Sequence, residues 1–221
     1  MQNFVILANQ RSGSTLLTNF LGSHGDITCY GEVIQAPGYH KLWSAYMEDK
    51  EKTEKKAHGF KLAMNFIDSL GLHWFLSEIK EMDYKVVLLL RKNKFLQGIF
   101  QRASFEWVGD QVRIKRANFI ERIEMFIEYE KKYSQLADII FTYEDMTNGE
   151  NISEFKNEKI RESLLSILGV DDQKLTSDMQ KNNRNTNSKL IINYEEVEDL
   201  EQKYGNHMPT LMNLKKSAIM F

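Results

Sequence analysis

A short polar stretch near the start of the chain has residues of the types and spacing that bind an anion. Arg11, Ser12, Gly13, Ser14 and Thr15 separate the apolar run of residues 4–8 from a segment in which apolar residues recur at helical spacing. The run predicts a parallel strand that is buried on both faces, so the stretch forms the turn into a helix. Free backbone N–H groups at a helix N-terminus attract phosphate or sulfate. An ordinary strand-to-helix turn would explain the pattern equally well.

This stretch is close to the loop that binds nucleoside triphosphates, but one residue is missing. That loop reads G-x-x-x-x-G-K-[ST], and its lysine reaches the β- and γ-phosphates. The matching positions here are Ala8, Gly13, Ser14 and Thr15, so Ser14 takes the place of the lysine. Arg11 supplies a positive charge within the loop instead. The loop therefore favours an anion, but it lacks the residue that a γ-phosphate normally needs.

Three further charged residues lie in or after segments that read as strands. Glu32 follows a short run with β-type residues, Lys61 lies inside a second run, and Arg91 ends the strongest one, residues 84–91. Open parallel sheets bind ligands at the carboxyl ends of their strands, so these residues are expected near the loop. Each also has a simpler explanation. Glu32 can be a solvated loop residue, Lys61 an edge lysine that reaches water, and Arg91 the partner of an acidic neighbour.

Alternating strands and helices are expected to position these residues. Strands are expected at residues 4–8, 27–30, 58–63, 84–91 and from 138, and helices after residue 15, at 39–56, 65–82, 93–104, 112–137 and 155–168, and from 194. This alternation predicts an α/β fold. Because neither a repeat nor a low-complexity linker divides the chain, we expect one domain over residues 1–221.

Composition narrows the class of protein. The chain has 221 residues, a net charge of −2 and a pI near 6.2, which argues against nucleic acid as the main partner. A single cysteine, Cys29, excludes an internal disulfide and a thiolate metal cage. The longest apolar runs fall far short of the ~20 residues that span a bilayer. Since the chain begins with the first expected strand, we expect no signal segment and a cytoplasmic location.

Five short motifs, taken in order, resemble the bacterial carbohydrate sulfotransferases of the trehalose and nodulation-factor type. They are Gln10-Arg11-Ser12-Gly13-Ser14-Thr15, Gly31-Glu32, Gly59-Phe60-Lys61-Leu62, Leu89-Leu90-Arg91 and Tyr143-Glu144-Asp145, and residues 193–197 look like the start of the family's C-terminal helix. The resemblance runs over most of the chain. It implies a P-loop-like three-layer α/β/α fold with a central, mainly parallel sheet that binds 3′-phosphoadenosine-5′-phosphosulfate (PAPS). PAPS has no γ-phosphate and the reaction needs no metal, which accounts for the missing lysine.

The resemblance also implies roles for single residues. The loop from Arg11 to Thr15 would hold the 5′-phosphosulfate, Arg91 the 3′-phosphate, and Glu32 would be the general base. Lys61 and Arg184 are further candidates for sulfate or phosphate contacts.

One feature of the family is missing. Ile99 and Phe100 occupy the positions where the family usually has a serine that bonds the 3′-phosphate. We expect Ser104, four residues beyond Phe100 on one helical face, to substitute. Alternatively, the 3′-phosphate is held more loosely.

The activity expected from these residues is sulfuryl transfer from PAPS to a hydroxyl or amine of a carbohydrate or small-molecule acceptor, with release of 3′-phosphoadenosine-5′-phosphate (PAP). Arg11 and the loop N–H groups would stabilise the developing charge, and Glu32 would accept the proton. Two alternatives stay open. One is a phosphotransferase that uses ATP, and the other is a PAP- or nucleotide-binding module without catalysis. The sequence leaves the acceptor and the oligomeric state undetermined.

Overall fold

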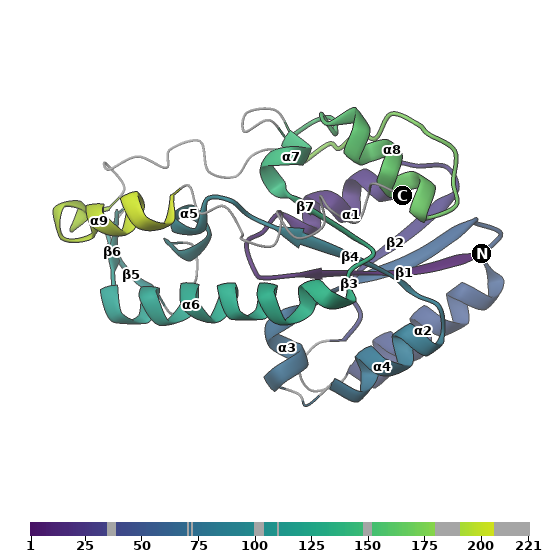
Figure 1. The fold of residues 1–221 in the computed structure, drawn as a ribbon, viewed down its shortest axis with the longest axis horizontal. Coiled ribbons are helices and arrows are strands. Elements are labelled where there is room, and N and C mark those ends of the chain that lie inside the picture. Colours follow the sequence, from purple (N-terminus) through teal and green to yellow (C-terminus); the bar gives the residue numbers. More distant parts are fainter. Residues whose placement is uncertain are drawn as a thin grey trace.

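The computed structural model describes residues 1–34, 39–69, 71, 73–99, 104–109, 111–147, 152–179 and 191–205. Its centre is a sheet of five parallel strands in the order β2-β3-β1-β4-β7 (Figure 1). The strands are β1 (Gln2–Ala8), β2 (Ile27–Glu32), β3 (Ala57–Ala63), β4 (Lys85–Leu90) and β7 (Ile139–Thr142). All five lie where the sequence predicts strands.

Helices cover both faces of this sheet (Figure 1). On one face lie α1 (Ser14–Gly22), α7 (Tyr143–Thr147) and α8 (Glu158–Ile167); on the other lie α2 (Tyr39–Lys52), α3 (Met64–Ser69) and α4 (His73–Glu81). Successive residues of β1 point to opposite faces, so Phe4 and Ile6 pack with α1 and α8, whereas Val5 and Leu7 pack with α3 and α4. The expected three-layer α/β/α architecture is confirmed.

The loop after β1 lies at the point where the order of the strands in the sheet reverses. The chain passes from β3 on one side of β1 to β4 on the other, and Ile6 of β1 lies opposite Lys61 of β3 and Val87 of β4. Ligands of open α/β sheets bind where the strand order reverses in this way. The fold therefore puts the N-terminus of α1 at the position where a ligand is expected.

A third group of elements extends beyond the carboxyl edge of the sheet (Figure 1). It comprises α5 (Lys94–Ile99), the antiparallel hairpin of β5 (Phe105–Val108) and β6 (Gln111–Ile114), α6 (Arg116–Tyr133) and α9 (Tyr194–Tyr204). Buried residues of these elements, among them Phe95, Val112, Phe119 and Val197, form a separate apolar cluster. This group gives the residues that follow β4 a core of their own.

Three expected helices need correction. Residues 111–114 alternate between exposed and buried as β6, so the helix expected from residue 112 begins at Arg116; it ends at Tyr133 and is followed by the 3-10 helix η1 (Ser134–Leu136). The single helix expected over residues 65–82 is two, α3 and α4. In the helix expected over residues 93–104, the described part is Lys94–Ile99, and the next described residue, Ser104, lies in the turn directly before β5.

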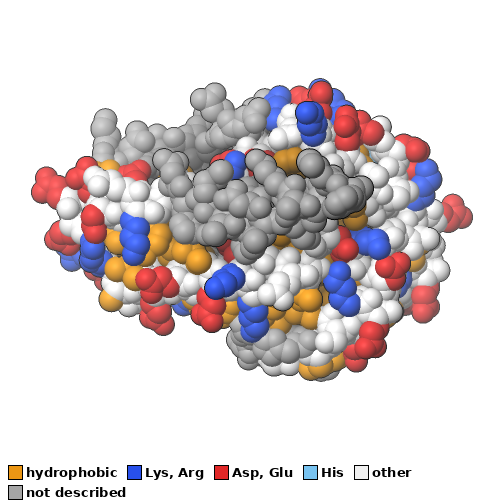
Figure 2. All heavy atoms as spheres, in the orientation of Figure 1, with side chains coloured by type: hydrophobic (Ala, Val, Ile, Leu, Met, Phe, Trp, Pro, Cys, Tyr) orange, Lys and Arg blue, Asp and Glu red, His pale blue; other side chains and the backbone are white. Residues whose placement is uncertain are grey.

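On the face seen in Figure 2, the described acidic and basic side chains are intermingled. Among the described helices, none is both long and apolar enough to cross a membrane.

Candidate active site

The loop between β1 and α1 has a backbone shape suited to binding an anion. Arg11 and Gly13 have positive φ angles of 60° and 91°. Gly13 is the N-cap of α1, no side chain caps this end of the helix, and its first turn contains no acidic residue. The N–H of Leu17 donates to the Gly13 carbonyl at 3.1 Å, which leaves the N–H groups before it without an acceptor inside the helix. Those donors and the helix dipole favour a phosphate or sulfate here.

The ring of Tyr143 packs so closely on Gly13 that no residue with a side chain fits at this position. A Cβ atom added at Gly13 would lie 2.4 Å from Cδ2 of that ring, which is shorter than any real contact of this kind. The guanidinium of Arg91 makes a cation–π contact with the same ring, and its Cζ lies 4.9 Å from the ring centroid. Tyr143 therefore fixes the loop and Arg91 against each other. The sequence places Tyr143 in a motif after a strand but does not reveal this contact.

Arg91 reaches the loop, as its position after β4 predicts. Its Nη1 donates to the Arg11 carbonyl at 2.7 Å. The acidic neighbour Glu144 instead accepts the N–H groups of Lys92 and Asn93, at 2.9 and 3.1 Å. Burial lowers the pKa of Arg91, although a guanidinium stays charged in proteins. Its Nε is buried and has no hydrogen-bond partner among the described residues.

Glu32 is joined to the start of α1 through Lys61. A bulge at Gly31 brings Glu32 opposite Lys61 in the pairing of β2 with β3. The Lys61 ammonium lies 3.4 Å from Glu32 Oε1 and donates to Thr15 Oγ1 at 2.9 Å. The Lys61 side chain is only 14% exposed and that of Glu32 28%, so neither is a fully solvated surface residue. The Lys61 ammonium thus contacts two of the expected site residues, and its contact with a sulfate or phosphate stays a prediction.

These residues form a row along the carboxyl edge of the sheet. Following the strand order, the row runs from Glu32 on β2 and Lys61 on β3 to the loop after β1 and then to Arg91 after β4. A carboxylate therefore lies on one side of the anion-binding loop and a guanidinium on the other. An elongated ligand with two anionic groups could contact the loop and Arg91 together.

Two expected site residues are not brought into this row. Ser104 lies in the turn before β5 and not in a helix, and residues 100–103 are outside the described part of the chain, so nothing places Phe100 and Ser104 on one helical face. Ser104 is fully buried, and its Oγ has no partner among the described residues, so its contact with the 3′-phosphate stays a prediction. Arg184 lies outside the described residues.

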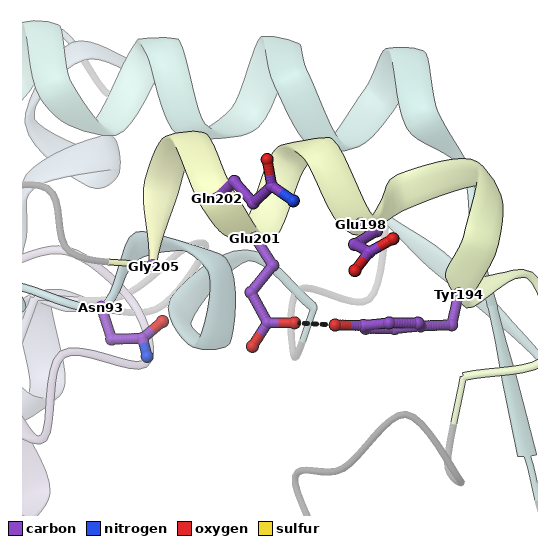
Figure 3. Close-up of a pocket in the computed structure, with 6 residues that line it drawn as sticks. All are labelled: Asn93, Tyr194, Glu198, Glu201, Gln202 and Gly205. Carbon is purple, nitrogen blue, oxygen red and sulfur yellow. Dashed lines mark hydrogen bonds between the residues drawn. The ribbon is translucent and has the colours of Figure 1, made fainter.

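A pocket of about 310 Å³ opens beside α9 and the start of α5 (Figure 3). Its lining includes Glu198 and Glu201, and the hydroxyl of Tyr194 donates to Glu201 at 2.5 Å. Asn93, also in the lining, comes two residues after Arg91, so the pocket lies on the side of the loop away from Glu32. Two carboxylates repel phosphate or sulfate, and we therefore do not assign this pocket to an anionic ligand.

Lys61→Met is expected to lower kcat/KM about 10- to 100-fold for the transfer reaction expected from the sequence, the effect of losing one charge-assisted hydrogen bond. The variant keeps the apolar stem but removes the ammonium between Glu32 and Thr15. Initial rates at several donor concentrations measure the change. Lys85→Met is the matched control, because Lys85 pairs with Asp83 at the opposite end of β4. An unchanged kcat/KM in Lys61→Met would remove Lys61 from the site.

Comparison with known proteins agrees with this geometry. Residues 3–71, which include the loop, Glu32 and Lys61, match the family model of Stf0 sulphotransferases. A solved structure of a sulfotransferase from Alicyclobacillus acidocaldarius aligns with a TM-score of 0.50 and 14% identity, over 96% of this chain and 99% of that one. At this identity the likeness shows the fold alone. No functionally curated protein matches in sequence. Residues 3–71 are thus similar to the Stf0 sulphotransferase family, which the five motifs also resemble, and the fold of the chain is that of a solved bacterial sulfotransferase.

Proposed function

We propose that this protein transfers the sulfuryl group of PAPS to a hydroxyl or amine of a carbohydrate or small-molecule acceptor and releases PAP. The observation that carries the proposal is the contact from Glu32 through Lys61 to Thr15. It joins a carboxylate able to accept a proton to a helix N-terminus able to bind a phosphosulfate. Because Ser14 replaces the lysine of triphosphate loops, the site suits a donor without a γ-phosphate.

The residues present fit PAPS as the donor. The open N–H groups at the start of α1, with Arg11, Ser12, Ser14 and Thr15 around them, would hold the 5′-phosphosulfate. Arg91 would hold the 3′-phosphate with the donors that the Arg11 carbonyl does not use. The order of strands supports this orientation of PAPS, since it places Glu32 and Arg91 on opposite sides of the loop.

In the reaction, a lone pair on the acceptor oxygen or nitrogen forms a bond to sulfur. The bond between sulfur and the bridging oxygen breaks, and its electron pair leaves with PAP. Glu32 takes the proton of the acceptor. Arg11 and the loop N–H groups stabilise the charge on the leaving phosphate, as fixed donors do in phosphoryl transfer. Lys61 holds Glu32 beside the loop through its contact with Thr15.

Transfer from PAPS to a panel of saccharides, hydroxylated natural products and amines tests this function. Mass spectrometry should find an acceptor that gains one sulfate group, with PAP formed in equal amount. If Mg-ATP phosphorylated the panel while PAPS gave no sulfated product, the protein would be a phosphotransferase. If PAP bound and no acceptor reacted, a nucleotide-binding module without catalysis would replace the proposal.

A further inference from the structure

A set of buried polar residues lies beneath the loop and belongs to neither the proposed donor contacts nor the general base. Asn9, Lys94, Gln97 and Glu130 are each at most 2% exposed. Asn9 directly follows β1, Lys94 and Gln97 lie on α5, and Glu130 lies on α6. Charged residues are rarely buried to this extent unless they are paired, so their contacts need an explanation.

The four side chains form a hydrogen-bonded circuit that begins and ends in the loop. Asn9 Nδ2 donates to Glu130 Oε1 at 3.0 Å, and the Lys94 ammonium contacts the same oxygen at 2.5 Å. Lys94 also donates to Gln97 Oε1 at 3.4 Å, and Gln97 Nε2 donates to the carbonyl of Gln10 at 2.9 Å. The hydrogen-bonded circuit thus includes two consecutive loop residues, the side chain of Asn9 and the carbonyl of Gln10.

The circuit also connects the two anion-binding elements. Lys94 begins α5 three residues after Arg91, and Glu144 holds the intervening N–H groups of Lys92 and Asn93. Burial raises the pKa of Glu130 and lowers the pKa of Lys94, because a charge is costly where water is excluded. Replacing a buried ion pair by apolar residues is often neutral or stabilising, so stability alone does not account for this one.

We propose that the buried Lys94–Glu130 pair is a positioning device, which holds Asn9 and Gln97 so that the loop and Arg91 keep their spacing for a donor with two phosphate groups. Lys94 and Glu130 act through the loop and are positioning residues. This inference rests on the proposed function, because the donor is the ligand whose two ends the circuit aligns.

The test separates positioning from stability with two variants. Lys94→Met alone leaves Glu130 buried without its cation and should destabilise the protein. The double variant Lys94→Met/Glu130→Leu removes both charges, and Asn9 keeps its 3.1 Å bond to the Phe126 carbonyl. Because Gln97 Oε1 loses its Lys94 donor, urea unfolding should show the double variant to be somewhat less stable than the wild type but clearly more stable than Lys94→Met. Calorimetry should nevertheless show that its Kd for PAP rises about 10-fold or more, because small shifts in a binding site are costly.

A purely structural role predicts a different pattern. PAP affinity would then follow stability, low in the single variant and restored in the double, and that result would overturn the inference. Gln97→Leu is a second test that does not depend on the folding of the double variant. It keeps the ion pair but removes the bond to the Gln10 carbonyl, and it should weaken PAP binding in the same way. Arg116→Met/Asp199→Leu, which removes an exposed ion pair between α6 and α9, is the control and should bind PAP normally.

The same titrations distinguish a failure of the proposed function from a failure of the positioning role. If the wild type did not bind PAP, the proposed function would fail. If the wild type bound PAP and both the double variant and Gln97→Leu bound it equally well, only the positioning role would fail.

Discussion

Glu32→Gln is expected to lower kcat for sulfuryl transfer about 10²- to 10⁴-fold, the usual contribution of a general base. Glutamine has nearly the same shape as glutamate, and its carbonyl oxygen can still accept a hydrogen bond from Lys61. It cannot accept the proton of the acceptor. The affinity for PAP should therefore change little while kcat falls. Single-turnover rates and PAP titrations on the same preparation measure the two quantities separately.

Glu48→Gln provides the matched control for this variant. Glu48 is an exposed glutamate on α2 that pairs with Lys52 one helical turn away, so its replacement should leave both kcat and PAP affinity unchanged. If Glu32→Gln retained the full kcat, Glu32 would not be the base. A fall in PAP affinity without a change in kcat would instead make Glu32 part of the donor site.

Gly13→Ala is expected to remove PAP binding and to destabilise the fold. The new methyl group would overlap the Tyr143 ring, and alanine at a φ of 91° is strained. Together these effects cost about 2 to 5 kcal/mol. For a protein of this size, each kcal/mol lowers the Tm by about 2 to 4 °C. Because the loop must move away from Tyr143, its N–H groups lose their common direction, and the Kd for PAP should rise at least ~10²-fold.

Gly22→Ala, in the same helix, controls for the change from glycine to alanine. A Cβ at Gly22 meets no atom within 4 Å, and its backbone is helical. Alanine favours a helix by about 1 kcal/mol over glycine, so this variant should be at least as stable as the wild type and bind PAP normally. Thermal unfolding and calorimetry compare the two. Normal PAP binding by Gly13→Ala would show that the backbone of this loop does not form the donor site.

The sheet and the row of site residues could be predicted from the sequence because each depends on local pattern. Buried parallel strands are read as continuous apolar runs, and the residue after each run lies at the edge where ligands bind. That reasoning placed Arg91 and the loop together, and the structure joins them by the bond to the Arg11 carbonyl. It also placed Glu32 at the correct edge, although only the bulge at Gly31 brings it opposite Lys61.

The parts that the sequence did not predict depend on contacts between distant residues. Lys94 and Glu130 are 36 residues apart, and each reads as a surface charge on a helix. The role of Tyr143 depends on its ring meeting Gly13, which no local pattern encodes. The hairpin of β5 and β6 was missed because strands of four residues are too short to separate from the apolar stripe of the following helix.

Calorimetric titration of PAP, AMP and Mg-ATP into the wild-type protein tests the central claim most directly. A loop without the phosphate-binding lysine, flanked by Arg91, predicts that PAP binds most tightly, that AMP binds more weakly because it lacks the 3′-phosphate, and that Mg-ATP gains nothing from its γ-phosphate. Arg91→Met should reduce PAP affinity towards that of AMP. If Mg-ATP bound more tightly than PAP, the assignment of the site to a sulfate donor would be contradicted.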